Sequence, residues 1–278
     1  MKFVFPGRVR RFGPALLAGL TLILAAPANE RRFTYSYEPE TMPAGAWEVE
    51  QWITWRKQRN QAVGQDRYHK FEFKTALEYG VTDNYTVELY LNTKSESFRD
   101  PTTRSDFSKF AFDGISLENR YLVFDPAEHP MGLALYLEPR LSDDEAELEE
   151  KIILGQRHGK WKWAVNLTHA TEWSGNFHHR EGELEFSAGV SYSLTKRWSV
   201  GAEIRDHNEL PDYDKWENTA VFLGPVVSYR NEKWWAALSL MPQIHGANFV
   251  TPDPDGNRHL ELEGHERLNI RLIFGFAF

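Results

Sequence analysis

Residues 183–194 read Glu183-Leu184-Glu185-Phe186-Ser187-Ala188-Gly189-Val190-Ser191-Tyr192-Ser193-Leu194. Apolar side chains alternate here with Glu and Ser, so one face of the stretch is apolar and the other is polar. Alternation with a period of two predicts a β-strand with unlike faces. The same pattern recurs along the chain, less regularly in the sixth segment, at 47–56, 70–79, 85–94, 115–123, 133–140, 146–157, 161–169, 198–205, 221–229, 234–240 and 268–278.

Twelve such segments exceed the roughly 20–25% strand content of an average globular protein. A soluble sandwich or barrel can also be rich in strands, so the character of the two faces decides. One face is charged or polar along nearly every segment, and the other carries large aromatic residues near the segment ends. A transmembrane barrel has lipid outside and a polar lumen inside, so its strands must alternate in this way. Closure of the barrel pairs every strand edge, which hydrocarbon requires. The sequence therefore predicts an all-β fold, a closed antiparallel transmembrane β-barrel of about twelve strands with a polar lumen.

The amino-terminal stretch is predicted to be a secretory signal peptide. Lys2, Arg8, Arg10 and Arg11 precede an apolar run at 14–26, which is shorter than the ~18 residues of a membrane-spanning helix. A retained membrane anchor is the alternative. The resulting division is a signal peptide at 1–28, a periplasmic segment at 29–44 and the barrel at 45–278.

Composition narrows the function further. After residue 28 the chain has 28 Lys and Arg against 40 Asp and Glu, a formal charge of −12, so nothing favours nucleic acid as a partner. The absence of Cys suits an oxidising compartment outside the cytoplasm and excludes thiolate metal sites.

The connections between the segments alternate between long and short with one lapse. This is typical of barrels with short periplasmic turns and longer extracellular loops, and an even strand number returns both termini to the periplasm. Residues 98–112 form the connection predicted to fold inward as a constriction or to cover the mouth. Aromatic girdles at the two membrane interfaces are expected from Trp47, Trp55, Trp161, Trp173, Trp198 and Trp234.

The polar faces give the candidate lumen residues. Acidic and basic side chains are nearly balanced, so a cross-barrel network of ion pairs that holds the wall together is one interpretation. A narrow pore of mixed charge, with mild cation preference, is the other. The side chains predicted to line the lumen are Glu48, Glu50, Arg56, Lys70, Glu72, Lys74, Glu78, Glu88, Glu118, Arg120, Glu138, Arg140, Glu183, Glu185, Glu203, Arg205 and Arg271.

The carboxy-terminal sequence Arg271-Leu272-Ile273-Phe274-Gly275-Phe276-Ala277-Phe278 resembles the assembly signal of bacterial outer-membrane barrels. The aromatics Phe274, Phe276 and Phe278 carry the resemblance, whereas Ile273 stands where the signal usually has Gly. The resemblance implies an outer-membrane location and recognition by the barrel-assembly machinery. Residues 38–50 are similar to the first-strand entry of outer-membrane proteins associated with aromatic-compound (phenol meta-pathway) degradation and of related uncharacterised barrels, which implies uptake of small molecules.

Two further interpretations concern enzymes and metals. Some outer-membrane barrels are lipid hydrolases, and His169 with Thr171 shares an outward face here, with Glu172 or Asn176 near in sequence. An interfacial His and Thr beside Trp173 is the simpler interpretation, so no enzyme is predicted. No metal site or cofactor is predicted either, because the six histidines placed outside lack fixed spacing, namely His178, His179, His207, His245, His259 and His265. Residues 253–257 resemble the start of a calcium loop but lack its terminal Glu, so they indicate a turn.

The sequence thus predicts a multi-pass outer-membrane barrel that contacts lipid and acts as a passive channel or transporter for a small solute. A closed barrel with a structural or surface-binding role is the first alternative, and a lipid-modifying enzyme is the second.

Overall fold

A computed structural model describes residues 30–278 apart from 60–65, 176, 212, 214 and 251–258. The predicted signal peptide at 1–28, Asn176 and the turn at 253–257 lie outside the described residues. No helix in the described part has the length and apolar character needed to cross a bilayer.

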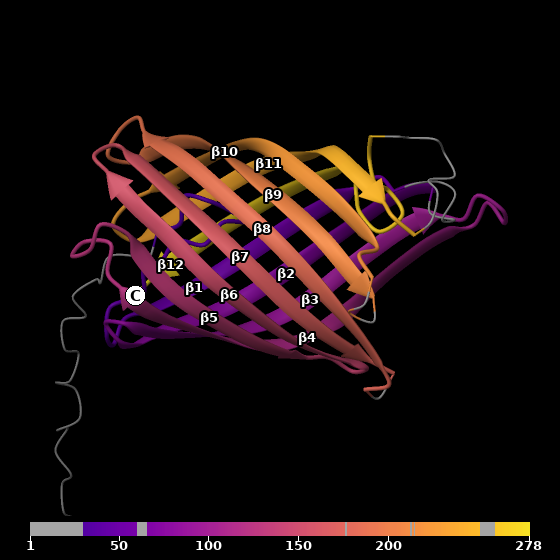
Figure 1. Ribbon diagram of the computed structural model, residues 1–278, viewed down its shortest axis with the longest axis horizontal. Helices are drawn as coiled ribbons and strands as arrows, with labels where there is room; N and C mark the ends of the chain where they lie inside the picture. The colour runs from indigo at the N-terminus through magenta and orange to yellow at the C-terminus, as the bar shows by residue number, and fades with distance from the viewer. Residues whose placement is uncertain (1–29, 60–65, 176, 212, 214, 251–258) are drawn as a thin grey trace, which may run out of the picture.

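The described residues form twelve strands that close into one antiparallel barrel (Figure 1), as predicted. Each strand pairs with its neighbours in sequence, and β1 pairs with β12 to close the wall. The strands are β1 (Trp47–Lys57), β2 (Asp66–Thr82), β3 (Tyr85–Arg99), β4 (Asp106–Phe124), β5 (Gly132–Leu141), β6 (Glu145–His158), β7 (Trp161–Ser174), β8 (His179–Ser193), β9 (Trp198–Pro211), β10 (Asn218–Arg230), β11 (Trp234–Asn248) and β12 (Leu268–Ala277).

The burial pattern of the wall is the reverse of that of a soluble protein. Outward-facing apolar side chains such as Leu91, Leu135 and Leu167 are about half exposed, whereas inward-facing carboxylates such as Glu48 and Glu118 are buried. A charged interior inside a continuous apolar surface is stable only when lipid covers that surface. The wall therefore spans a membrane.

Aromatic residues gather at the strand ends. Trp198 and Trp234 begin their strands, and Tyr229 contacts both rings, with centroids 4.8 and 4.7 Å apart. The other predicted girdle residues Trp47, Trp161, Trp55 and Trp173 begin a strand or lie near its outer end. Amphipathic rings at these levels suit the two membrane interfaces.

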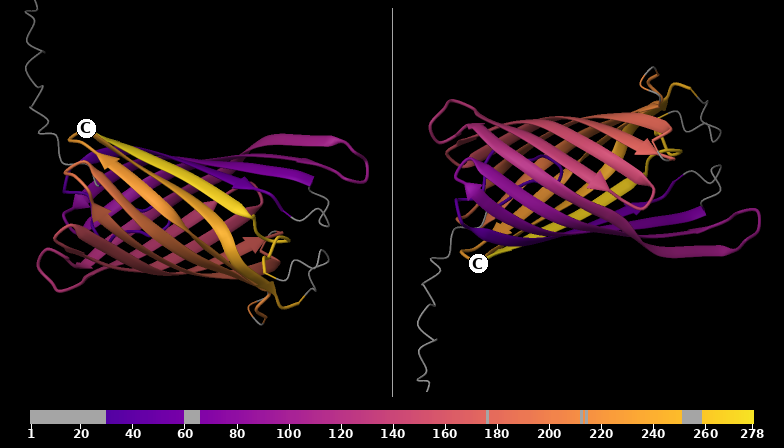
Figure 2. Two further views of the ribbon diagram at one scale, coloured as in Figure 1. Left: turned by 90° about the horizontal axis from the view of Figure 1, so that it is seen from above. Right: turned by 90° about the horizontal axis from the view of Figure 1, so that it is seen from below.

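The connection at 98–112 differs from its prediction. Strands β3 and β4 continue through it as a hairpin that projects beyond the barrel rim (Figure 2), and Phe110 is 68% exposed. The Asp100 carboxylate accepts hydrogen bonds from the backbone N–H groups of Thr102 and Thr103 at the tip. The expectation of an inward constriction or a cover is therefore wrong, because cross-strand pairing extends the hairpin straight outward.

Residues 30–44, part of the segment predicted as periplasmic at 29–44, enter the barrel at the end that also holds the carboxy terminus (Figures 1 and 2), and most of their side chains are buried. Phe33, Thr34, Ser36 and Met42 in this stretch are fully buried. We call residues 30–44 the lumen segment.

Candidate functional site

The lumen segment is held by side chains of the wall. It has no strand partner, so its backbone N–H groups need acceptors from side chains. Glu203 on β9 supplies them: Oε1 accepts the N–H groups of Tyr35 and Ser36 at 2.8 and 2.9 Å, and Oε2 accepts the N–H and hydroxyl of Thr34 at 2.9 and 3.0 Å. Asn166 bonds both backbone groups of Tyr37. Because these contacts are buried and directional, they fix the segment in one position.

Aromatic rings of the lumen segment and of the wall form a layer across the lumen, which is the floor of the cavity described below. Tyr37 packs against Trp52 and Tyr136, with ring centroids 6.0 and 5.2 Å apart. Arg271 lies 3.8 Å from the ring centroid of Tyr35, and Arg31 lies 4.0 Å from that of Tyr37. Cation–π contacts of this kind are strongest when desolvated, so they strengthen the packing at this end of the barrel.

A polar cavity of about 430 Å³ lies on this floor. Its charges are divided between two arcs of the wall. The arc formed by β12, β1, β2 and β3, with the residue Arg59 that follows β1, contributes six basic side chains and one acidic side chain: Arg56, Arg59, Lys70, Lys74, Lys94 and Arg271, with Glu72. The arc from β4 to β9 contributes nine acidic and three basic side chains: Asp113, Glu138, Glu145, Glu147, Glu149, Glu172, Glu183, Glu185 and Glu209, with Arg140, Lys151 and Arg205. The cavity therefore has a positive and a negative side.

The loop between β11 and β12 closes one side of the cavity. Its residues 259–267, which we call the inner loop, turn into the lumen, where His265 and Glu266 are buried. Gln243 on β11 donates to the carbonyl oxygens of Glu261 and Glu266 at 2.7 and 3.3 Å. Arg59 donates to the Gly264 carbonyl at 2.7 Å. An inward-folded loop thus exists, although it is not the one predicted.

Two groups of the inner loop have shifted pKa values. The Glu261 carboxylate accepts backbone N–H groups from Glu263, Gly264 and His265, and burial still raises its pKa. Burial lowers the pKa of His265 well below its usual range, and His207 and Arg205 lower it further. His265 is therefore a neutral imidazole at pH 7.

The predicted lumen residues all point to the interior, at two levels. Those around the lumen segment include Glu78 and Glu118, which pair with Arg120 at 3.1 and 2.8 Å. At the level of the cavity, Arg140 contacts Glu147 at 2.7 Å and Asp113 at 3.7 Å. The lower level holds Glu48, Glu50, Glu78, Glu88, Glu118, Arg120 and Glu203, and the cavity is lined by Arg56, Lys70, Glu72, Lys74, Glu138, Arg140, Glu183, Glu185, Arg205 and Arg271.

Among the described residues, which leave out Asn176, the hydrolase group considered from sequence is not assembled. Glu172 faces the lumen cavity, on the opposite side of the wall from His169. The hydroxyl of Tyr213 lies 3.4 Å from His169 Nε2 and hydrogen-bonds Thr171, while Glu150 lies 3.4 Å from His169 Nδ1. The Tyr213 ring packs over Gly182, where a Cβ atom would meet it at 2.9 Å. Tyr213 thus occupies the place beside His169.

A closed, lipid-facing wall around a charged lumen defines the protein as an outer-membrane β-barrel. The chain belongs to DUF6662, a family of unknown function, which matches residues 25–148 and 149–278. Comparison with curated protein sequences finds no significant match.

Solved structures with a similar fold share little sequence with the chain. The COG4313 outer membrane channel from Pseudomonas putida F1 is 12% identical, with 88% of this chain and 100% of that chain covered and a TM-score of 0.60. The NanC porin is 10% identical, with coverages of 83% and 100% and a TM-score of 0.51. The translocator domain of the autotransporter NalP from Neisseria meningitidis is 12% identical, with coverages of 84% and 89% and a TM-score of 0.50. At these identities the likeness concerns the fold alone.

Proposed function

We propose that this barrel is a passive outer-membrane channel for a small charged solute, closed at rest by the lumen segment. The observation that carries the proposal is the polar cavity with its basic and acidic sides. Lys94 pairs with Asp113 and Lys74 with Glu138 where the arcs meet, but a structural barrel needs no solvent-sized space whose two sides differ in net charge. A channel uses such sides to select solutes. The channel and porin named above, which share the fold, support the same function.

The arrangement of charge favours a solute that carries both signs. A zwitterion can lay its cationic group toward Glu147 and Glu149 and its anionic group toward Lys70 and Lys74. The cavity volume falls within the usual range for sites that take small molecules. The chain after residue 28 has a formal charge of −12, so small cations should pass more readily than small anions.

Conduction requires the lumen segment to move, because it fills the periplasmic half of the lumen. A disulfide can test this, since the natural chain has no Cys. The hydroxyls of Thr34 and Ser239 lie 2.5 Å apart, so Thr34→Cys with Ser239→Cys places two sulfur atoms within bonding reach. The double variant is reconstituted in a planar bilayer under a salt gradient, before and after reduction.

We expect discrete conductance steps after reduction and silence in the oxidised form. The single variant Ser239→Cys serves as the control and should conduct in both states. Equal conductance of the oxidised and reduced double variant would show that the lumen segment does not close the channel. Folded protein that gives no conductance in any form would reject the channel and favour the closed barrel. The hydrogen bonds that hold the lumen segment in place support that alternative.

A further inference from the structure

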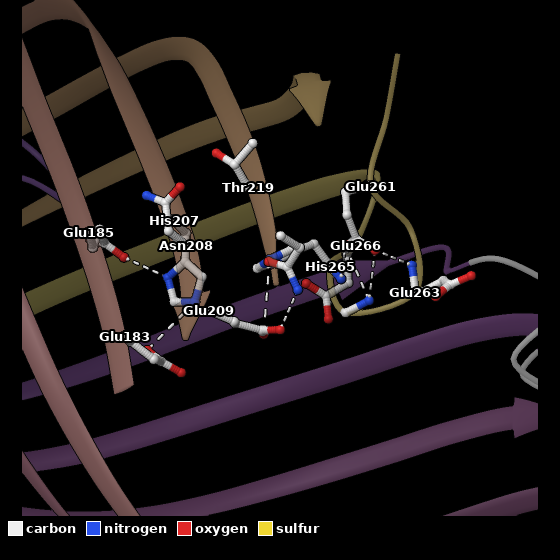
Figure 3. A network of polar contacts seen from close by, with 12 residues as sticks. Glu183, Glu185, His207, Asn208, Glu209, Thr219, Glu261, Glu263, His265 and Glu266 are labelled. Carbon is white, nitrogen blue, oxygen red and sulfur yellow. Dashed lines mark hydrogen bonds and ion pairs between the residues drawn. The ribbon is translucent and has the colours of Figure 1, made fainter. Parts of the chain in front are cut away.

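The cavity holds a cluster of imidazoles and carboxylates that the channel proposal does not use. His207 and Glu209 lie two residues apart on β9 and therefore point to the same, inner face. On the neighbouring strand β8, Glu185 lies opposite His207 in the strand register, and Glu183 lies opposite Glu209. His265 approaches the group from the inner loop, as Figure 3 shows.

The distances suit a metal ion. One donor atom each from His207, Glu209 and His265 can be chosen so that all lie within 4.8 Å of one another. Bonds of about 2.0–2.2 Å in a tetrahedral zinc site place ligand atoms roughly 3.3 Å apart, so small side-chain rotations would complete the geometry. Glu183 Oε2 lies 3.6 Å from His207 Nε2, so a rotation of its side chain would bring this carboxylate to the fourth coordination position.

Outer contacts position these groups. His207 Nδ1 lies 3.2 Å from the Glu185 carboxylate, and Glu185 is held by Arg205 at 2.6 Å. Asn218 donates to Glu209 at 2.5 Å, and its Oδ1 lies 2.9 Å from His265 Nε2. Arg205 also lies 2.8 Å from His207 Nδ1, but a metal at Nε2 would fix the tautomer in which Nδ1–H donates to Glu185. A carboxylate in this outer position, such as Glu185 beside His207 Nδ1, is the usual partner of a metal-binding histidine. Asn218 holds the carboxylate of Glu209.

The charges also match. A divalent cation bound by two neutral imidazoles and the carboxylates of Glu183 and Glu209 would give a neutral site. The nearby cations are already engaged: Arg205 pairs with Glu185, and Arg56 and Arg59 both pair with Glu266. Mixed nitrogen and oxygen donors favour Zn²⁺ or a similar first-row transition metal over Mg²⁺ or Ca²⁺.

We propose that His207, Glu209 and His265, with Glu183, form a binding site for a divalent transition-metal ion that fastens the inner loop to the barrel wall. The ligands come from β8, β9 and the inner loop, so the bound ion cross-links segments that are otherwise joined by hydrogen bonds. Metal binding needs only the folded barrel, so the site does not depend on conduction.

The test uses the folded full-length chain in detergent near pH 7.5, with Zn²⁺ measured by titration calorimetry and Co²⁺ followed by its visible absorption. We expect one equivalent to bind, with affinity reduced at least about tenfold in His265→Gln and in Glu209→Gln. His179→Gln is the matched control, because His179 is an exposed residue of β8 outside the cluster, and it should bind like the natural chain. Both substitutions in the cluster keep side chains of similar size. A gel that compares unheated with heated samples shows whether each variant is folded, because the heated, unfolded barrel migrates more slowly.

A second readout follows the inner loop itself. Arg267 is exposed at its end, and Zn²⁺ should slow tryptic cleavage after this residue in the natural chain but not in His265→Gln. Failure to bind Zn²⁺, or equal loss of affinity in His179→Gln, would overturn the proposal. Binding that leaves cleavage after Arg267 unchanged would overturn the fastening of the loop.

Discussion

Replacing Glu203 by Gln should release the lumen segment from the barrel wall. Gln keeps one oxygen, which can still accept from Tyr35 and Ser36, but its amide nitrogen replaces the oxygen that accepts from Thr34. The loss of the Thr34 hydrogen bonds to a charged acceptor, together with a buried Thr34 N–H group left without an acceptor, would cost about 3–5 kcal/mol. The neutral Gln avoids the cost of burying a charge, so we expect a net loss of about 2 kcal/mol. This corresponds to a roughly 30-fold larger population of released segment.

Cysteine labelling measures that population. Ser36 is buried and its hydroxyl has no hydrogen-bond partner among the described residues, so Ser36→Cys provides a single reporter thiol in a chain without other Cys. The maleimide reaction should be about 30-fold faster when Glu203→Gln is added. Glu72→Gln is the control, because Glu72 pairs with Arg56 and Lys70 on the cavity wall. Equal labelling rates with and without Glu203→Gln would refute the role of Glu203.

Three further predictions concern the lumen segment, the cavity and the outer hairpin. Gly189→Ala places a Cβ atom 2.6 Å from the Phe33 ring, so it should also speed labelling of Ser36→Cys, and an unchanged rate would contradict that contact. Glu147→Gln with Glu149→Gln should shift the reversal potential of the reduced, open channel toward anions, whereas Lys70→Gln with Lys74→Gln should shift it toward cations; no shift in either pair would remove these groups from the solute path. Two backbone N–H groups, of Thr103 and Thr102, lower the pKa of Asp100, so the carboxylate stabilises the hairpin tip above its unfolded pKa of about 3.8, and this contribution is lost as the pH falls through the lower folded value. The amide chemical shifts of Thr102 and Thr103, measured as the pH is lowered, should change as the Asp100 carboxylate is protonated. Chemical shifts that stay constant would contradict this prediction.

The barrel wall could be predicted because lipid imposes a simple rule. Alternate positions must be apolar, so segments such as 183–194 reveal both the strand and its inner face. Trp52 breaks the rule from the inside: it faces the lumen because the floor under the cavity is aromatic. Alternation predicts about twelve strands and the inner face of each, and the need of lipid for paired strand edges predicts closure.

The contents of the lumen could not be predicted in the same way. The lumen segment carries Phe33, Tyr35 and Tyr37 alternating with Thr34 and Ser36, a signal too short to show that the stretch lies inside the barrel. Its partners, Glu203 and Asn166, lie more than a hundred residues away, so no local pattern points to them. The inner loop has no period at all, because its backbone is fixed by single side chains such as Gln243.

The prediction for the hairpin of β3 and β4 is wrong for a different reason. Beyond the membrane neither face needs to be apolar, so Phe107 and Phe110 stand among charged residues and the alternation fades. Backbone pairing persists there without the solvent contrast that makes a strand visible in sequence.

The seam between β1 and β12 sets the order in which this chain can reach its final state. It joins Glu48 to Ala277 and Lys57 to Leu268, so the contacts that close the wall are among the most distant in the sequence. Such contacts carry the largest loop-closure entropy and form slowly. Until β12 arrives, both β1 and β11 present unpaired edges that hydrocarbon does not tolerate. Chains interrupted before Leu268 would therefore remain outside the bilayer, and insertion itself would discriminate finished chains from unfinished ones.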